Sequence, residues 1–174
     1  MSSPGNPRHN CADRRSTAQA ESGNLYVVLA IRPLAASEVE KVTAVLGLAR
    51  LYQGDGVYFV AWEGDEALGH LHRALIDPPE LQDVEVRADR RRLGVASALV
   101  RYAEDEVRVR GFDRIRLGVS IDNLPAQFLY RRHGFVDAGL GMKRIKEVVH
   151  LRTGAFAVDD TWLIWEKRFA DMTP

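Results

Sequence analysis

Residues 89–97 read Asp-Arg-Arg-Arg-Leu-Gly-Val-Ala-Ser, and they join a predicted strand at 81–88 to the most regular predicted helix, at 94–110. A helix begins with backbone N–H groups that have no partner within it, and this end carries about half a positive charge. Gly94 and Ala96 are small enough to let a ligand approach these N–H groups, and Arg91 and Arg92 add permanent charge. The stretch therefore predicts an anion site for a phosphate or pyrophosphate.

Two familiar phosphate-binding patterns do not fit this stretch. A P-loop needs Gly-Lys-Ser/Thr before the helix, whereas this chain has Gly94-Val95-Ala96-Ser97. A dinucleotide fingerprint needs three glycines and an acid at the end of the next strand, and of these only Gly94 is present. A capped helix behind a solvated arginine loop remains the alternative to an anion site.

The chain around this stretch alternates predicted strands with predicted helices. Ser37, with Glu40 three residues later, is the expected N-cap of the first helix. The helix at 94–110 combines an apolar stripe with opposite charges at i,i+4 on its solvent side, Glu104 and Arg108 among them. Residues 142–157 show no clear pattern and leave an extra strand at 148–151 open. The predicted strands are 25–31, 57–62, 67–76, 81–88, 115–119, 135–136 and 161–166. The helices follow Ser37, Gly94 and a cap at either Asn123 or Asp122. This order indicates an α/β protein with a mixed sheet covered by helices.

Composition predicts one globular domain. The chain has 174 residues, of which 46% are hydrophobic and 28% charged. Residues 1–23 contain no Val, Ile, Leu, Phe, Trp or Tyr and predict a disordered tail, before a single domain at 24–174. No apolar run approaches the roughly 20 residues of a membrane helix, and the tail lacks the apolar segment of a signal peptide. We therefore expect a cytoplasmic protein with no membrane partner. The single cysteine, Cys11, excludes an internal disulfide and a cysteine metal cluster.

The charges are unevenly distributed although the formal net charge is zero. Residues 24–86 carry four basic and ten acidic side chains, and residues 87–133 carry eleven arginines and six acids. The basic segment favours an anionic ligand and the acidic segment a cationic one, although solvated surface charge gives the same counts. RNA binding through Arg87, Arg90, Arg91 and Arg92 is disfavoured because no aromatic residues are interleaved with these arginines. We expect no nucleic-acid partner.

Two sequence motifs together resemble a known family. Arg91-Arg92-Leu93-Gly94-Val95-Ala96 matches the pattern Q/R-x-x-G-x-G/A, and a strand, Asn123 and Ala126-x-x-Leu129-Tyr130-x-x-x-Gly134-Phe135 follow it. Over about residues 25–168 the chain resembles the GNAT family of acyl-CoA-dependent N-acyltransferases. The resemblance implies a twisted mixed sheet of about seven strands with splayed central strands, flanked by about four helices. It also implies acetyl-CoA as cosubstrate, no metal, and direct transfer of an acetyl group to a primary amine of a small molecule or an amino terminus.

The resemblance implies a set of cofactor-binding residues. The pyrophosphate of the cofactor would lie on the loop and first helical turn formed by Arg91, Arg92, Leu93, Gly94, Val95, Ala96 and Ser97, in agreement with the anion site above. Val84 and Val86 would pair through their backbones with the pantetheine arm, and the N–H of Val86 would lie next to the thioester carbonyl. Asn123 would contact the pantetheine through its side chain.

The resemblance also implies a general acid. Tyr130 would stand beside the sulfur of the cofactor, where a phenol can supply the proton that a thiolate leaving group needs. A structural role, with Tyr130 packed on the sheet, is the alternative. His133 is expected at the surface near the helix end, and Cys11 lies in the tail, which disfavours a covalent cysteine intermediate.

A general base is needed because an amine with a pKa near 10 arrives mostly protonated. Glu85 and Glu80 are the candidates, with Asp83 beside them. Many members of the family have an acid where this chain has Gln82, so the position of the base cannot be carried over directly. His70 and His72 share one face of the strand at 67–76 and are expected on a half-exposed edge rather than in the acceptor site.

Several functional questions stay open at the sequence level. A non-catalytic acyl-CoA-binding module is the alternative to an enzyme. Trp62, Trp162 and Trp165 form either an aromatic wall for the acceptor or part of the core. A homodimer through the C-terminal strands is a further possibility.

Overall fold

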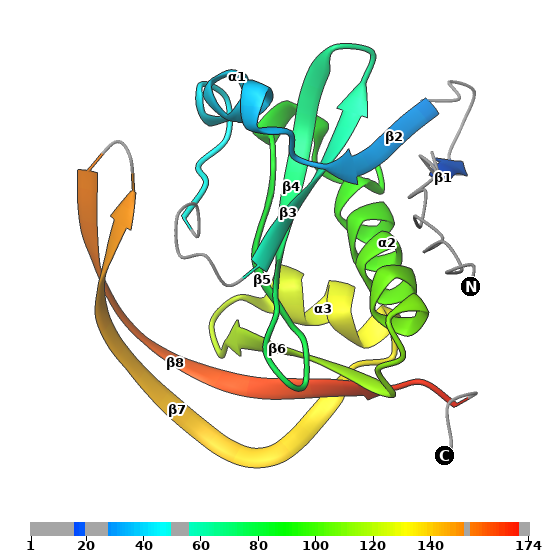
Figure 1. Cartoon of the computed structure of the whole chain (residues 1–174). Helices are drawn as coiled ribbons and strands as arrows, with labels where there is room; N and C mark the ends of the chain where they lie inside the picture. Colours follow the sequence, from blue (N-terminus) through cyan, green and yellow to red (C-terminus); the bar gives the residue numbers. More distant parts are fainter. Residues whose placement is uncertain (1–15, 20–27, 50–55, 152–153, 171–174) are drawn as a thin grey trace, which may run out of the picture.

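The computed structural model describes residues 16–19, 28–49, 56–151 and 154–170. Eight strands form one mixed sheet in the order β1-β2-β3-β4-β5-β6-β8-β7 (Figure 1). All neighbouring pairs are antiparallel except β5 and β6, which are parallel. The strands are β1 (Ser16–Gln19), β2 (Val28–Pro33), β3 (Gly56–Glu63), β4 (Glu66–Ala74), β5 (Glu80–Val86), β6 (Arg114–Ser120), β7 (Val136–Leu151) and β8 (Gly154–Arg168). The predicted α/β class with a mixed sheet is confirmed.

Helices cover the sheet on both faces. The described residues hold three α-helices, α1 (Val39–Thr43), α2 (Val95–Val109) and α3 (Leu124–Arg132), where about four were expected. Alternate residues of β3 enter two separate cores, because successive side chains of a strand point to opposite faces. Phe59 packs with α2 in the larger core, whereas Tyr58 and Val60 pack with Val42 of α1 in the smaller one. None of the described helices is long and apolar enough to cross a membrane.

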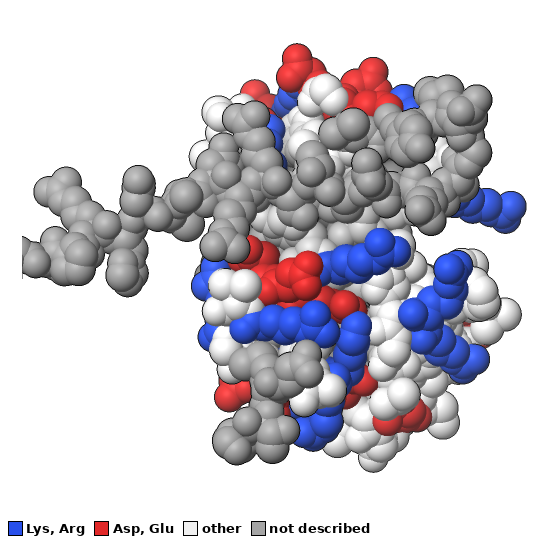
Figure 2. Space-filling model, turned by 90° about the vertical axis from the view of Figure 1, so that its right-hand side faces the viewer, with Lys and Arg blue, Asp and Glu red and all other residues white. Residues whose placement is uncertain are grey.

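Helix α2 has the predicted apolar stripe, which packs on the sheet. Its residues Val95, Leu99, Ala103 and Val107 are buried. The side of the molecule that carries α2 shows acidic and basic side chains intermixed (Figure 2), and Asp105–Arg108 and Glu106–Arg110 pair there. Glu104 is not on this solvent side as expected: it is buried and bonded to Lys167 of β8 at 2.7 Å.

The start of α1 differs from the prediction. Ser37 is not an N-cap, because it lies inside a short 3-10 helix, Ala36–Glu38, that precedes α1. The Glu38 carboxylate accepts the Ala35 N–H at 3.3 Å and binds Arg32 at 2.6 Å. The Glu38 side chain thus holds the start of the 3-10 helix to β2, and Glu38 is itself the N-cap residue of α1 but makes no side-chain cap bond to it.

The two ends of the chain contain more strand than expected. Ser16–Gln19, inside the predicted tail, pair with β2 as strand β1, while the rest of residues 1–23 lies outside the described residues. The unclear segment 142–157 extends the predicted strands at 135–136 and 161–166 into β7 and β8. These two strands form a long curved ribbon that projects beyond the rest of the sheet (Figure 1).

Candidate active site

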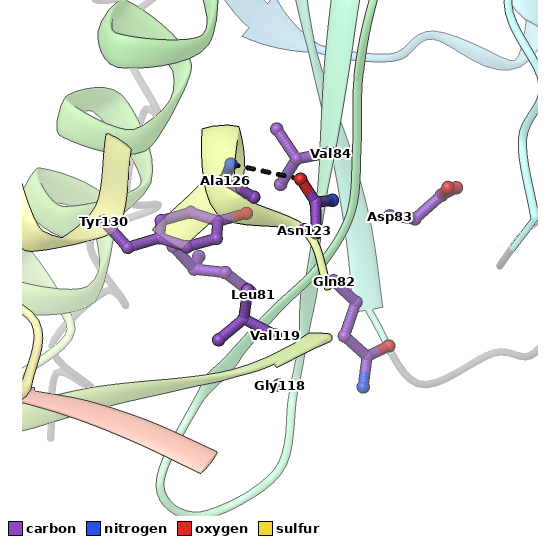
Figure 3. A pocket seen from close by; sticks show the side chains of 9 residues that line it. All are labelled: Leu81, Gln82, Asp83, Val84, Gly118, Val119, Asn123, Ala126 and Tyr130. Carbon is purple, nitrogen blue, oxygen red and sulfur yellow. Dashed lines mark hydrogen bonds between the residues drawn. The ribbon is translucent and has the colours of Figure 1, made fainter. Parts of the chain in front are cut away.

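A pocket of about 160 Å³ opens between β5 and β6 (Figure 3). The two strands pair at Glu80 with Arg116 and at Leu81 with Leu117, and no pair is formed farther along the described strands. The strands then diverge, and α3 lies beside the gap. We call this pocket the β5–β6 opening; it is lined by Leu81, Gln82, Asp83, Val84, Gly118, Val119, Asn123, Ala126 and Tyr130.

A β-bulge in β5 explains the divergence. His70 of β4 pairs with Glu85 and His72 pairs with Gln82, so Leu71 faces two residues, Asp83 and Val84. Asp83 adopts a left-handed backbone conformation with φ of 46°, as the bulged strand bends. The Asp83 carboxylate accepts hydrogen bonds from the Tyr58 hydroxyl and from the Ala49 N–H, the latter at 2.9 Å. These bonds stabilise the bend that opens the pocket.

Tyr130 lies on the α3 side of the β5–β6 opening. The residue is 7% exposed, and its ring packs edge-on against Phe135 with the centroids 5.9 Å apart. Its hydroxyl end points into the opening, toward Asn123 and Val84 (Figure 3). Burial raises the pKa of Tyr130 to about 12, so the phenol remains protonated at neutral pH. The side chain is a proton donor held in an apolar surrounding.

Asn123 is the N-cap of α3. Its Oδ1 accepts the Ala126 N–H at 3.1 Å, and Pro125 lies in the first turn of the helix. The cap uses the oxygen of the amide and leaves its NH₂ group free to donate into the opening that the residue lines. The sequence-predicted contact residue therefore lies at the pocket with a donor available.

The loop before α2 presents an uncapped helix start. A 3-10 turn, Ala88–Arg90, precedes it, and Arg92 and Gly94 have φ of 63° and 83°. Gly94 is the N-cap and provides no side-chain cap. Ala98 N–H begins the helical bonding, to the Gly94 carbonyl at 2.9 Å. The earlier N–H groups of the first turn therefore suit an anion, as the sequence predicts.

The residues of this loop differ in whether their side chains can reach a bound anion. Arg91, Arg92 and Leu93 are all exposed, and Arg91 also donates from Nε to the Val86 carbonyl at 3.1 Å. Val95 is buried in the core, so its backbone alone can reach a ligand. Ser97 turns away toward α3 and lies 2.7 Å from Nε2 of His133. His133 is not a surface residue: its side chain is 7% exposed.

Val86 presents a backbone N–H to the gap between β5 and β6. Arg87 N–H bonds to the Leu68 carbonyl of β4 at 2.9 Å. Because successive N–H groups of a strand point to opposite sides, the N–H of Val86 points away from β4, toward the gap. Val84 belongs to the bulge and lines the opening. The side chain of Val86 is in the core and does not line the pocket.

The base candidates lie on the other face of the sheet from Tyr130. Gln82 and Asp83 point away from Tyr130 (Figure 3). The Glu85 carboxylate is 44% exposed and lies 3.7 Å from Nε2 of His70. The His70 ring holds the pKa of Glu85 below its ordinary value, an effect larger than the opposing one of partial burial. Glu80 accepts the Gln82 side-chain amide at 3.0 Å, at the paired end of β5.

His70 and His72 are not on a half-exposed edge. They are 0% and 2% exposed, because β4 is a central strand between β3 and β5. The Tyr58 ring lies 5.1 Å and 4.9 Å from theirs, centroid to centroid. The sequence reasoning did not find the contact of Nε2 of His70 with the Gly47 carbonyl, since that partner lies far away in the chain.

The described residues contain no group of three or more His, Cys, Asp or Glu side chains placed to hold a metal ion.

Basic and acidic groups lie on different sides of the β5–β6 opening. Arg92 and the start of α2 lie beyond the Val86 end of β5, and the carboxylates of Asp83 and Glu85 lie on its α1 side. An anionic ligand and a cationic one can therefore approach the opening from different sides.

Comparison with known proteins identifies the class to which this fold and site belong. Residues 30–135 match the model of the acetyltransferase (GNAT) family. The chain is 32% identical to the uncharacterized N-acetyltransferase YsnE of Bacillus subtilis over 94 residues, which are 52% of this chain and 62% of that relative. The match thus spans less than two thirds of the relative's length.

Solved structures agree in fold. The ribosomal-protein-S18-alanine N-acetyltransferase of Escherichia coli superposes with a TM-score of 0.64 at 18% identity, over 80% of this chain and 93% of that one. A putative streptothricin acetyltransferase of Bacillus anthracis, solved with acetyl coenzyme A, gives 0.62 at 14% identity, over 81% and 99%. The chain belongs to the GNAT acetyltransferase family.

Proposed function

We propose that this protein transfers the acetyl group of acetyl-CoA directly to a primary amine, carried by a small molecule or an amino terminus. One observation carries the proposal: the buried hydroxyl of Tyr130 points into the β5–β6 opening, and carboxylates of β5 lie on the opposite face. Tyr130 would thus donate a proton to the departing sulfur from one face of the sheet, and a β5 carboxylate would accept the amine proton from the other face.

The residues of the chain fit the proposed cosubstrate. The uncapped start of α2 and Arg92 would hold the pyrophosphate. The N–H groups of Val84 and Val86 and the amide of Asn123 would hold the pantetheine arm, which takes the place that β6 leaves when it diverges from β5. Backbone groups left buried without such a partner would cost about 1–3 kcal/mol each.

The chemistry follows from these positions. The bound thioester supplies an activated acetyl group. The free amine attacks its carbonyl carbon, the C–S bond breaks, and the sulfur leaves with the electron pair. The Val86 N–H would stabilise the oxyanion, and Tyr130 would donate its proton to the sulfur. Glu85, directly or through water, would accept the proton that the amine loses, with Glu80 as the second candidate.

The experiment is a thiol-release assay with the purified protein, acetyl-CoA and a panel of primary amines. We expect release of CoA thiol that depends on the amine, with a matching acetylated product by mass spectrometry. Acetyl-CoA binding without turnover of any amine would contradict the enzyme and favour a non-catalytic acyl-CoA-binding module.

A further inference from the structure

The indole ring of Trp162 lies on the proposed acceptor side of the opening. The chain has three tryptophans, and Trp62 and Trp165 are 2% and 3% exposed. They belong to the two cores, which contradicts a wall formed by all three. Trp162 of β8 is only half-buried.

The two core tryptophans already have cations from the chain itself. Arg32 lies 4.7 Å and Lys41 5.6 Å from the ring centroid of Trp62, and Arg131 lies 5.2 Å from that of Trp165. Within the described part of the chain, no cation lies over the Trp162 ring. Its face is therefore available to a cation that the chain does not supply.

The ring is held rigidly by its neighbours. Its Nε1 donates to Asp160 Oδ2 at 2.9 Å, while Asp160 Oδ1 accepts from the Ser120 hydroxyl at 3.0 Å and from the Thr161 N–H at 2.6 Å. On its other side the ring lies against Gly118, where a Cβ atom would come within 2.7 Å of Trp162 Cε3. Gly118 thus allows the ring to lie close to β6.

This position is beside the β5–β6 opening and on its acceptor face. Gly118 lines the opening, and Leu117 and Val119 on either side of it point into the larger core. Gly118 therefore faces the opposite side, which is the side of Gln82 and Asp83. Neighbouring strands lie about 5 Å apart, so the ring stands on the order of 5–10 Å from the gap between β5 and β6.

The charges on this face favour a cation. Glu80, Asp83 and Glu85 of β5 contribute three carboxylates, and Asp160 beside the ring contributes a fourth. Arg116 also lies there but is paired with Glu166 at 2.8 Å. Lys143, directly across from Trp162 in β7, is exposed and adds one positive charge. Arg144, whose charge acts on Asp160, is paired with Asp159 at 2.6 Å. With the pairs Arg116–Glu166 and Arg144–Asp159 set aside, four carboxylates and one cation remain.

We propose that Trp162 binds a second positive group of the acceptor, so that the substrate is a diamine or a related cationic amine whose other amino group reacts at the opening. This inference rests on the proposed acetyl transfer and specifies its substrate class. The second ammonium group lies over the indole face while Asp160 holds the ring in place.

The test compares n-butylamine with 1,4-diaminobutane, which differs from it by one terminal ammonium group. Because 1,4-diaminobutane has two equivalent amino groups, kcat/KM is compared per amino group, and we expect the wild type to favour the diamine by about 2- to 30-fold, the range that cation–π contacts give. Trp162→Leu should abolish this preference, and Trp162→Phe, which keeps a ring, should retain part of it. Lys143→Gln, which removes the positive charge across from the ring, should increase it.

A second readout does not depend on turnover. Titration of 1,4-diaminobutane should change the tryptophan fluorescence of the wild type and not that of Trp162→Phe, with thermal melting to verify that each variant is folded. Equal kcat/KM for the two amines, unchanged by Trp162→Leu, would overturn this inference and leave acetyl transfer intact. Failure of every amine, with no CoA released, would instead overturn the proposed function.

Discussion

The carboxylate of Glu85 lies 3.7 Å from Nε2 of His70, whose side chain is completely buried in the middle of the sheet. The contact holds the acid on the α1 side of β5, while Tyr130 lines the β5–β6 opening from the α3 side. Because the His70 ring lowers the pKa of Glu85 from 4.5, the carboxylate is ionised at neutral pH. It can accept a proton without first losing one.

Replacing Glu85 should therefore slow the reaction. We expect Glu85→Gln to lower kcat about 100-fold or more at neutral pH, the usual contribution of general base catalysis. Raising the pH should restore part of the loss, since more of the amine is then free. Glu80→Gln is the matched control on the same strand, and an equal loss in that variant would assign the base to Glu80 instead.

Glu85 also makes stability depend on pH in a defined direction. Its pKa in the folded protein is below 4.5, so the stabilising contribution is complete above that value and is lost as the pH falls through the lowered pKa. Urea unfolding of wild type and Glu85→Gln should therefore differ at pH 6 and converge in acid. A difference that grows as the pH falls would contradict the assignment.

Tyr130→Phe should separate chemistry from binding. The variant keeps the ring and loses the proton donor, so we expect kcat to fall about 100-fold or more while the acetyl-CoA dissociation constant changes little. With a pKa of about 12, the tyrosine should impose no loss of wild-type activity up to about pH 10. Full activity of Tyr130→Phe would assign the residue to packing alone.

Gly94 can be tested against a second glycine with the same backbone requirement. Gly94 and Gly64 have φ of 83° and 56°, and a side chain in this region costs roughly 1–2 kcal/mol. Both Gly94→Ala and Gly64→Ala should lower the melting temperature, but Gly94→Ala alone should weaken acetyl-CoA binding, because Gly64 lies in the β3–β4 turn. Equal binding by the two variants would exclude the loop before α2 as the pyrophosphate site.

The buried ion pair between Glu104 and Lys167 joins α2 to β8. The Glu104 side chain is 6% exposed and Lys167 Nζ lies 2.7 Å from it. Lys167→Met leaves the buried carboxylate with only the His133 ring, whose Nδ1 lies 3.6 Å from Oε1, and should cost up to about 3–5 kcal/mol in denaturant unfolding. Glu104→Leu combined with Lys167→Met should recover much of this, whereas breaking the exposed Asp105–Arg108 pair should cost under about 1 kcal/mol. A small loss for Lys167→Met alone would show that the pair is dispensable.

The sequence predicted the segments whose pattern is local. The α2 stripe, the Gly94 loop and a cap at Asn123 or Asp122 each depend on residues within a few positions of one another. The stripe and the loop are present, and Asn123 is the cap. Glu104 was misplaced because its partner, Lys167, comes from a strand 63 residues later. His70 and His72 were misplaced because strand order, which alternation does not reveal, decides which strand is at an edge.

The shape of the candidate site could not be predicted from the sequence. The apolar residues Leu81, Val84 and Val86 do not show where β5 bulges, and the bulge depends on Asp83 meeting Tyr58 and Ala49 from distant segments. The position of Trp162 likewise depends on Gly118 in another strand. Local structure carried by one motif could be predicted from the sequence, whereas a bulge and a ring position that depend on several strands could not.

The most direct test of the account is thermal melting of the full chain with acetyl-CoA, CoA, NAD and ATP. A ligand at about 100 times its dissociation constant adds roughly 2.7 kcal/mol. For a chain of this size we predict a shift of about 5–10 °C with acetyl-CoA and no comparable shift with NAD or ATP. The absence of a shift with any CoA compound would contradict the β5–β6 opening as a cofactor site and with it the proposed acetyl transfer.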